Sequence, residues 1–124
     1  MTHTPIIAII DDDDGVRVAL TSLIRSLGYA VRGYVSAIDF LDENRSGEPD
    51  CLICDIQMPQ MSGDELQAGL LDAGRNLPII FMTVFPTALT RERVLSAGAQ
   101  AVLEKPVDGG VIAHHLEAVL KQNF

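Results

Sequence analysis

Short apolar runs alternate with longer segments of helical period along this chain. The run 6–10 is apolar at every position, which is typical of a central strand covered on both faces. Further strands are expected at 30–34, 51–55, 79–82 and 101–103. Helical patterns follow the strands: after Asp14, from Ser36 to Leu41, from Ser62 to about Gly74, at about 89–97 and around 112–120.

This alternation predicts an α/β fold in which helices cover both faces of a parallel sheet. Because crossover connections are right-handed, the doubly wound, flavodoxin-like (βα)5 arrangement with strand order 2-1-3-4-5 is favoured. A length of 124 residues suits one domain, and no internal repeat or linker interrupts the pattern. We therefore expect residues 1–124 to form a single domain with a core from about 5 to 121.

Side-chain patterns predict how the helices begin and which residues face the sheet. Asp13 and Asp14 are expected to serve the first helix as N-terminal cap and dipole partners. Ser36 with Asp39, and Ser62 with Glu65, resemble capping boxes at the starts of the second and third helices. The apolar stripes place the following leucines inward: Leu20, Leu23 and Leu27 in the first helix, and Leu66, Leu70 and Leu71 in the third.

The charge of the chain excludes some classes of function. A net charge of −8 argues against a nucleic-acid-binding surface, because phosphate contacts require a basic face. No apolar run approaches the roughly 20 residues that a membrane span needs, and no basic N-terminal region marks a signal peptide. We therefore expect a cytoplasmic protein with no direct nucleic-acid or membrane contacts.

Cys51 and Cys54 form a C-x-x-C pattern that could indicate a redox or zinc pair. Both lie in the expected strand 51–55, where positions three apart point to opposite faces. A disulfide or a shared metal would need both side chains on one face. We therefore expect two separately packed, reduced thiols.

Polar residues lie where the predicted strands end. Asp11 and Asp12 follow the first strand, Asp55 ends the third, Thr83 ends the fourth and Lys105 follows the fifth. Ligands of doubly wound sheets bind beyond these carboxyl ends, so we expect the five side chains to converge. Three neighbouring carboxylates repel one another unless a cation compensates, and oxygen ligands favour a hard ion such as Mg²⁺.

Several motifs with suitable spacing make the chain similar to a known family. The matching residues are Ile9-Ile10-Asp11-Asp12, Asp55 with Met58-Pro59 and Gly63, Thr83, Gly98-Ala99 and Lys105-Pro106. Over about residues 5–121 the chain resembles the receiver domain of bacterial two-component response regulators. The stretches 11–17 and 55–63 are most similar to the FixJ-type regulators.

The resemblance implies that Asp55 accepts a phosphoryl group from a sensor histidine kinase. Asp12, Asp55 and the backbone carbonyl of Gln57 would ligate Mg²⁺ or Mn²⁺ directly, and Asp11 would do so directly or through water. Such a domain catalyses only its own phosphorylation and dephosphorylation, and it switches partner binding or dimerisation.

Two further residues have implied roles. Lys105 would pair with phosphoryl oxygens, and Thr83 would donate a hydrogen bond to them. The family also implies a cis Lys105–Pro106 bond and homodimerisation through the helix at 89–97, the strand at 101–103 and the last helix. No effector domain is expected after Gln122, so the chain is either a single-domain regulator or a receiver excised from a longer one.

Two positions depart from the family pattern. Val102 stands where receivers usually carry an aromatic residue that moves with the threonine, so the usual coupling from threonine to aromatic is not expected here. Val84, followed by Phe85, stands where a small residue is usual. We expect these side chains to crowd the site and to prolong the phosphorylated state by hindering the attacking water.

Three alternatives remain open at this point. A Mg²⁺-dependent aspartyl phosphohydrolase typically carries a second acid two residues after its nucleophile, where this chain has Gln57. A flavin-binding module needs an anion-binding loop after the first strand, where Asp11 to Asp14 would repel phosphate. The third alternative is a degenerate receiver that acts as a phosphorylation-independent interaction module.

Overall fold

The five expected strands form one parallel sheet in the computed structural model, which describes residues 3–43 and 47–123. The strands are β1 (Ile6–Ile10), β2 (Ala30–Tyr34), β3 (Cys51–Asp55), β4 (Ile79–Thr83) and β5 (Ala101–Glu104). Their order is β2-β1-β3-β4-β5, so the predicted doubly wound topology is confirmed. β1 and β3 are adjacent in the sheet although a crossover through β2 separates them in sequence.

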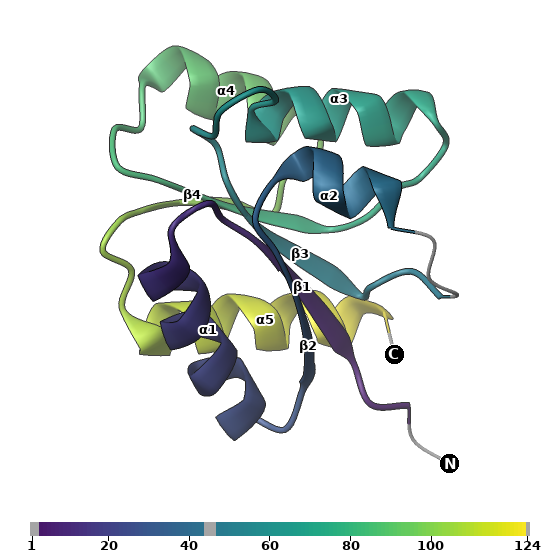
Figure 1. The fold of residues 1–124 in the computed structure, drawn as a ribbon, viewed down its shortest axis with the longest axis vertical. Coiled ribbons are helices and arrows are strands. Elements are labelled where there is room, and N and C mark those ends of the chain that lie inside the picture. The colour runs from purple at the N-terminus through teal and green to yellow at the C-terminus, as the bar shows by residue number, and fades with distance from the viewer. Residues whose placement is uncertain (1–2, 44–46, 124) are drawn as a thin grey trace.

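The helices cover both faces of this sheet (Figure 1). They are α1 (Asp14–Ser26), α2 (Ala37–Asp42), α3 (Gly63–Asp72), α4 (Ala88–Ser96) and α5 (Gly109–Asn123). Helices α1 and α5 pack on one face, where Ile24 and Leu116 join the apolar side chains of that layer. Helices α2, α3 and α4 pack on the other face, where Phe40, Leu66 and Val94 do the same. Two apolar layers therefore hold the sheet rigid from both sides.

Most of the predicted helix starts are confirmed. Asp13 caps α1 by accepting a hydrogen bond from the backbone N–H of Val16 at 3.1 Å. Ser36 caps α2, and Ser62 forms a complete capping box with Glu65 at the start of α3. These caps fix where the strand-to-helix loops end, and so they fix the lengths of the loops at the carboxyl edge of the sheet.

Two leucines that were expected to face the core are exposed. Leu27 is 39% exposed because α1 ends at Ser26 and the chain turns at Leu27, which leaves the apolar stripe. Leu71 is 44% exposed, whereas its neighbour Leu70 is 2% exposed. Successive helical residues point about 100° apart, so α3 buries one of this leucine pair and leaves the other at its edge.

The two cysteines lie on opposite faces of β3, as predicted. Cys51 belongs to the apolar layer beneath α1 and α5, and Cys54 belongs to the layer beneath α2, α3 and α4. Both are free and fully buried. Burial, with a smaller effect from the charge of Asp50, raises the pKa of Cys51 to about 12, and burial also raises the pKa of Cys54.

Thiol reagents should therefore leave Cys51 and Cys54 unmodified in the folded domain and modify both after denaturation. Because the folded pKa lies above the ordinary value of 9.0, the two thiols contribute stability below that pH. The contribution is lost as the pH rises from 9.0 toward 12. Counting alkylated thiols by intact mass, with and without denaturant, tests this prediction, and rapid modification of either cysteine in the folded domain would contradict it.

Among the helices that the structure describes, we find none with the length and apolarity that crossing a bilayer requires.

The parallel register brings the predicted site residues to one edge. Ile10 pairs with Cys54 across β1 and β3, so Asp11 and Asp55, which follow them, are side by side. Asp55 pairs with Met82, and Thr83 pairs with Glu104. Lys105 directly follows Glu104, the last residue of β5. All of these positions lie at the carboxyl edge of the sheet, where the strand order reverses direction from β1.

Candidate functional site

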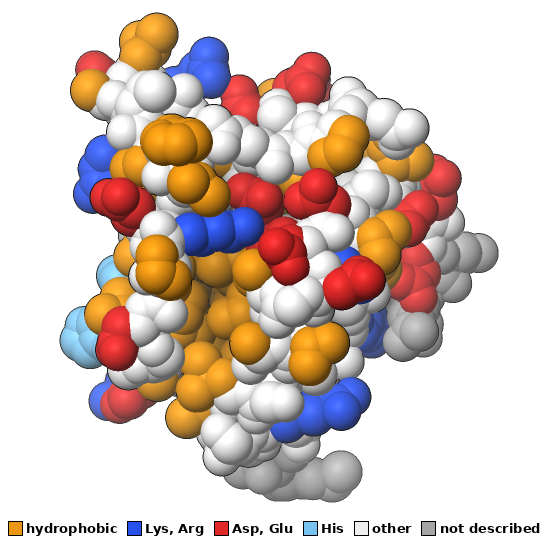
Figure 2. Space-filling model, turned by 60° about the vertical axis from the view of Figure 1, so that its left-hand side comes forward, with side chains coloured by type: hydrophobic (Ala, Val, Ile, Leu, Met, Phe, Trp, Pro, Cys, Tyr) orange, Lys and Arg blue, Asp and Glu red, His pale blue; other side chains and the backbone are white. Residues whose placement is uncertain are grey.

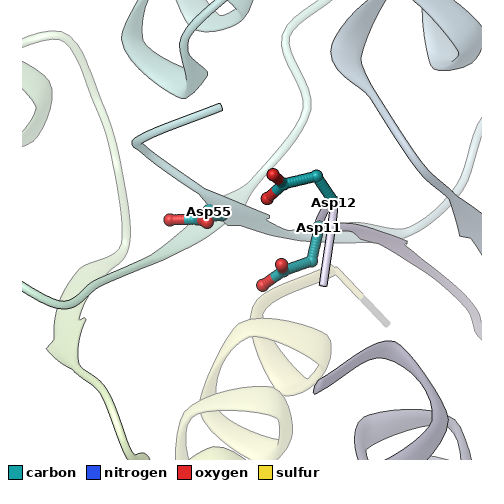
Figure 3. Close-up of side chains that lie close together, drawn as sticks. All are labelled: Asp11, Asp12 and Asp55. Carbon is teal, nitrogen blue, oxygen red and sulfur yellow. The ribbon is translucent and has the colours of Figure 1, made fainter. Parts of the chain in front are cut away.

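Three carboxyl groups meet at the ends of β1 and β3. Each of Asp11, Asp12 and Asp55 offers one oxygen that lies within 4.8 Å of the other two (Figure 3). Asp11 and Asp55 are buried, at 0% and 6% exposed, whereas Asp12 is exposed to solvent. The structure thus brings together three of the residues that the sequence predicted, in a set of hard oxygen donors with one side open to water.

Backbone groups hold the two buried carboxylates. Asp11 extends the β1–β2 pairing through its N–H, which donates to the carbonyl of Tyr34 at 3.1 Å. The N–H of Asp13 donates to Asp11 Oδ1 at 2.9 Å, and the N–H of Gln57 donates to Asp55 Oδ1 at 3.2 Å. Each carboxylate therefore has one oxygen fixed by the loop that follows it, and its second oxygen faces the centre of the site.

Lys105 bridges those second oxygens. Its Nζ lies 2.9 Å from Asp11 Oδ2 and 3.2 Å from Asp55 Oδ2, and its side chain is 14% exposed. Its backbone N–H donates to the carbonyl of Thr83 at 2.8 Å, which ties the loop after β5 to the end of β4. The Lys105–Pro106 bond is cis, as predicted.

Charge and burial oppose each other at this centre. Burial is the largest influence on the pKa of Asp55 and raises it, the charge of Asp11 adds to the increase, and Lys105 acts in the opposite direction. Burial lowers the pKa of Lys105, but the hydrogen bonds and charges of Asp11 and Asp55 together outweigh it and leave that pKa raised. One ammonium thus faces three carboxyl groups, and a divalent cation fits the negative charge that remains.

Thr83 and Gln57 lie beside the carboxylates. Thr83 ends β4 with 1% exposure, and its Oγ1 accepts a hydrogen bond from the N–H of Phe85 at 3.3 Å. Within residues 3–43 and 47–123 the hydroxyl proton has no recorded acceptor, so it can donate to a group at the site. Gln57 has an exposed side chain and follows Asp55 by two residues, so its contribution to the site is through its backbone.

Gly63 is a positioning residue whose importance the sequence did not reveal. A Cβ at this position would lie 2.6 Å from the carbonyl oxygen of Asp55 and 2.9 Å from a ring carbon of Phe81. Its N–H donates to the carbonyl of Ile56 at 2.8 Å. The start of α3 therefore packs directly on the end of β3, and a side chain here would displace Asp55. The motif contained this glycine, but the close contact depends on how α3 returns to the sheet.

The two departures from the family pattern differ in their surroundings. Val102 is buried at 6% exposure in the layer beneath α2, α3 and α4. Val84 lines an apolar groove of about 400 Å³ together with Lys105 and Pro106, and Figure 2 shows this groove with acidic side chains above it. Phe85 is 73% exposed, so it does not pack over the site as was expected of the pair.

Comparison with known proteins agrees with this geometry. Residues 7–117 match the model of the response regulator receiver domain. The chain is 36% identical over 116 residues to the response regulator protein TodT of Pseudomonas putida, covering 94% of this chain and 51% of TodT. It is 37% identical over 112 residues to the transcriptional regulatory protein FixJ of Azorhizobium caulinodans, covering 90% and 53%.

The fold comparison leads to the same group of proteins. The crystal structure of FixJ-N superimposes with a TM-score of 0.84 at 31% identity, covering 95% of this chain and 94% of that one. The parallel α/β sheet and the carboxylate cluster at its carboxyl edge agree with a signalling domain of this class. The chain belongs to the response regulator receiver domain family, and FixJ is among its relatives. It spans about half the length of the curated relatives that it matches.

Proposed function

We propose that this domain is a phosphoacceptor switch in which Asp55 takes a phosphoryl group from a phosphohistidine of a sensor kinase. A carboxylate oxygen of Asp55 attacks phosphorus, the phosphorus–nitrogen bond of the donor breaks, and the imidazole leaves with the bonding electron pair. The observation that carries the proposal is the placement of the Lys105 ammonium within hydrogen-bond reach of both Asp11 and Asp55. A cation beside the Asp55 oxygen supports the proposal, because it would stabilise the phosphoryl charge that arrives there.

The donor set also fits a metal ion. Three carboxyl groups with oxygens within 4.8 Å, and one partly solvated side, match the preference of Mg²⁺ for a few carboxylates and several waters. We infer that Asp11, Asp12 and Asp55, with the backbone carbonyl of Gln57, hold Mg²⁺, and that Mn²⁺, which also accepts oxygen ligands, could replace it. When bound, the ion neutralises charge on the phosphoryl oxygens.

Lys105, Thr83 and Asp11 have separate roles toward the phosphoryl group. Lys105 exchanges its contact with Asp55 for one with a phosphoryl oxygen, because esterification removes the negative charge of that carboxylate. The Thr83 hydroxyl donates to a second phosphoryl oxygen. Asp11 remains ionised beside Lys105 and keeps the ammonium oriented. In this proposal the domain acts on no other substrate and catalyses only its own phosphorylation and dephosphorylation.

Incubation with a small phosphoryl donor and Mg²⁺, followed by intact mass measurement, tests the proposed function. We expect one added phosphoryl group that disappears with time and does not form after Mg²⁺ is chelated. No added mass would indicate a phosphorylation-independent interaction module instead. Continuous hydrolysis of a stable phosphate ester would indicate an aspartyl phosphohydrolase.

Replacing Val84 with alanine should shorten the life of the phosphorylated state. Val84 lines the groove beside Lys105, and a smaller side chain would give water easier access to the aspartyl phosphate. The first-order loss of the added mass, followed after removal of the donor, measures this effect. The matched control is Val18→Ala, because Val18 is an exposed valine on α1 that does not line the groove. Equal decay rates in Val84→Ala and the wild type would contradict the prediction.

The proposed partners follow from the site and from one surface. A sensor histidine kinase supplies the phosphoryl group, and the α4–β5–α5 face is the proposed homodimer surface. On that face, Arg91 donates to the carbonyl of Val102 at 2.9 Å, and Leu89 is 73% exposed.

The proposal includes no direct nucleic-acid binding by this domain, because its net charge is −8, and it retains the cytoplasmic location predicted from the sequence. Sedimentation with and without the phosphoryl donor tests the dimer.

A further inference from the structure

Arg17 lies on the first turns of α1 and reaches back to the loop that carries the aspartates. Its side chain is 18% exposed, which is low for an arginine near a helix start. The stem passes beside β2, with Cδ at 3.8 Å from where a Cβ on Gly33 would lie. The guanidinium is thereby directed toward the end of β1 and away from solvent.

Two nitrogens of this guanidinium bind the acidic loop. Nη1 donates to the backbone carbonyl of Asp11 at 2.7 Å. Nη2 forms an ion pair with the carboxylate of Asp14. Arg17 thus joins the residue before the loop to the residue after it, and Asp12 and Asp13 lie between these two anchors.

The contacts of Asp11 show why this matters for the site. Lys105 holds one end of the Asp11 side chain, and the N–H of Asp13 holds the other oxygen. The main chain of Asp11 is held by Tyr34 on one side and by Arg17 on the other. The guanidinium is therefore a side-chain contact through which α1 helps to fix the direction in which the chain leaves β1 toward Asp12.

Four consecutive aspartates would otherwise favour a loop in which their charges are far apart. Mg²⁺ requires near-octahedral geometry, so its affinity depends on carboxylates that already point together. We propose that Arg17 is a positioning residue that holds the β1–α1 loop in the conformation in which Asp11 and Asp12 converge on the ion. This inference rests on the proposed metal role of those two residues.

Positioning by Arg17 would increase the affinity for Mg²⁺, whereas the positive charge of Arg17 would decrease it. A cation near the site repels Mg²⁺, so a purely electrostatic role predicts tighter binding when the charge is removed. Positioning predicts weaker binding, because the loop must then be ordered when the ion arrives. The two roles therefore give opposite signs in the same experiment.

The experiment compares two variants. Arg17→Gln removes both the positive charge and the pair of guanidinium nitrogens that bind the loop. Arg17→Lys keeps the charge but has only one nitrogen. Mg²⁺ is titrated calorimetrically into each protein and into the wild type. The matched control is Arg25→Gln, an exposed arginine in the last turn of the same helix. We expect Kd for Mg²⁺ to rise by about tenfold or more in both Arg17 variants, as is usual for groups that orient metal ligands, and to stay unchanged in Arg25→Gln.

A second readout separates positioning from general destabilisation. The Mg²⁺ concentration that half-saturates phosphoryl uptake should rise in Arg17→Lys, while the rate at saturating Mg²⁺ stays near that of the wild type. Unchanged or tighter Mg²⁺ binding in Arg17→Gln, or wild-type affinity in Arg17→Lys, would overturn the inference. If Arg17→Gln does not fold, Arg17→Lys alone decides. Failure of the wild type to bind Mg²⁺ would instead overturn the proposed function.

Discussion

Asp55→Asn will take up no phosphoryl group, and without Mg²⁺ it will unfold at a higher temperature than the wild-type domain. The loss of uptake is expected because an amide oxygen is not a nucleophile toward phosphorus under conditions where a carboxylate is. The gain in stability is expected because Asp55 is 6% exposed and its charged form is disfavoured by burial and by Asp11. Asparagine has the same shape without the charge, and Lys105 keeps its ion pair with Asp11.

The sign of the pH dependence follows from the raised pKa of Asp55. A group whose pKa is higher in the folded state favours folding most below its unfolded value, which is ordinarily 3.8, and this contribution is lost as the pH rises through the folded value. The difference in unfolding temperature between Asp55→Asn and the wild type should therefore be largest at neutral pH. It should narrow as the pH falls toward the ordinary carboxyl range.

Thermal unfolding measures the predicted gain in stability of Asp55→Asn, and intact mass measures its loss of phosphoryl uptake. Asp72→Asn is the matched control, because it removes an exposed acid at the end of α3 and should change neither uptake nor the unfolding temperature. Phosphoryl uptake by Asp55→Asn would place the acceptor on another residue. A lower unfolding temperature in this variant would mean that the Lys105–Asp55 contact outweighs the cost of the buried charge.

The sequence predicted this site well because parallel strands share a carboxyl edge. Wholly apolar runs such as 6–10 identified the buried strands, and a polar residue directly after such a run can lie only at the edge. The positions of Asp11, Asp55 and Lys105 followed from this rule without knowledge of any distance. The opposite facing of Cys51 and Cys54 followed in the same way from the period of a strand.

The features that the sequence did not predict depend on contacts between distant elements. Leu71 continues an apolar run, but α3 buries its neighbour Leu70 and leaves Leu71 44% exposed at the edge of the layer. Gly63 touches the Asp55 carbonyl only because α3 folds back over the end of β3. The reach of Arg17 to the Asp11 carbonyl depends on how α1 lies against the end of β1 and beside β2. Periodicity describes one element at a time, so it carried no signal for the contacts of Gly63 and Arg17.

Val102 illustrates the limit of reasoning from a family pattern. The sequence showed that the usual aromatic residue is missing, and the structure shows that the valine is buried where α4 packs on β5. Polar contacts fasten α4 in addition, since Arg91 binds the Val102 carbonyl and Arg93 pairs with Asp64 at 2.8 Å. A displacement of α4 that moves Arg91 or Arg93 away would break this hydrogen bond or this ion pair.

Mg²⁺ will stabilise the wild-type domain, and Asp12→Ala will lose most of that stabilisation. An ion that binds only the folded state raises the free energy of unfolding by about 2.7 kcal/mol when it is present at 100 times its dissociation constant. Asp12 is the exposed member of the carboxylate cluster, so its removal should cost little packing while it deletes one ligand. Removing one of three mutually repelling charges should also leave the metal-free variant at least as stable as the wild type.

Chemical denaturation at several Mg²⁺ concentrations measures this linkage directly. Each titration is repeated at equal ionic strength with a monovalent salt, because general screening would stabilise an acidic chain without any site. Asp72→Asn again serves as the control, since it changes the net charge by the same amount as Asp12→Ala but lies outside the cluster. An equal Mg²⁺ response in Asp12→Ala and Asp72→Asn would contradict the assignment of Asp12 as a ligand. A response confined to the wild type and Asp72→Asn would support Asp12 as a ligand of the ion that stabilises the fold.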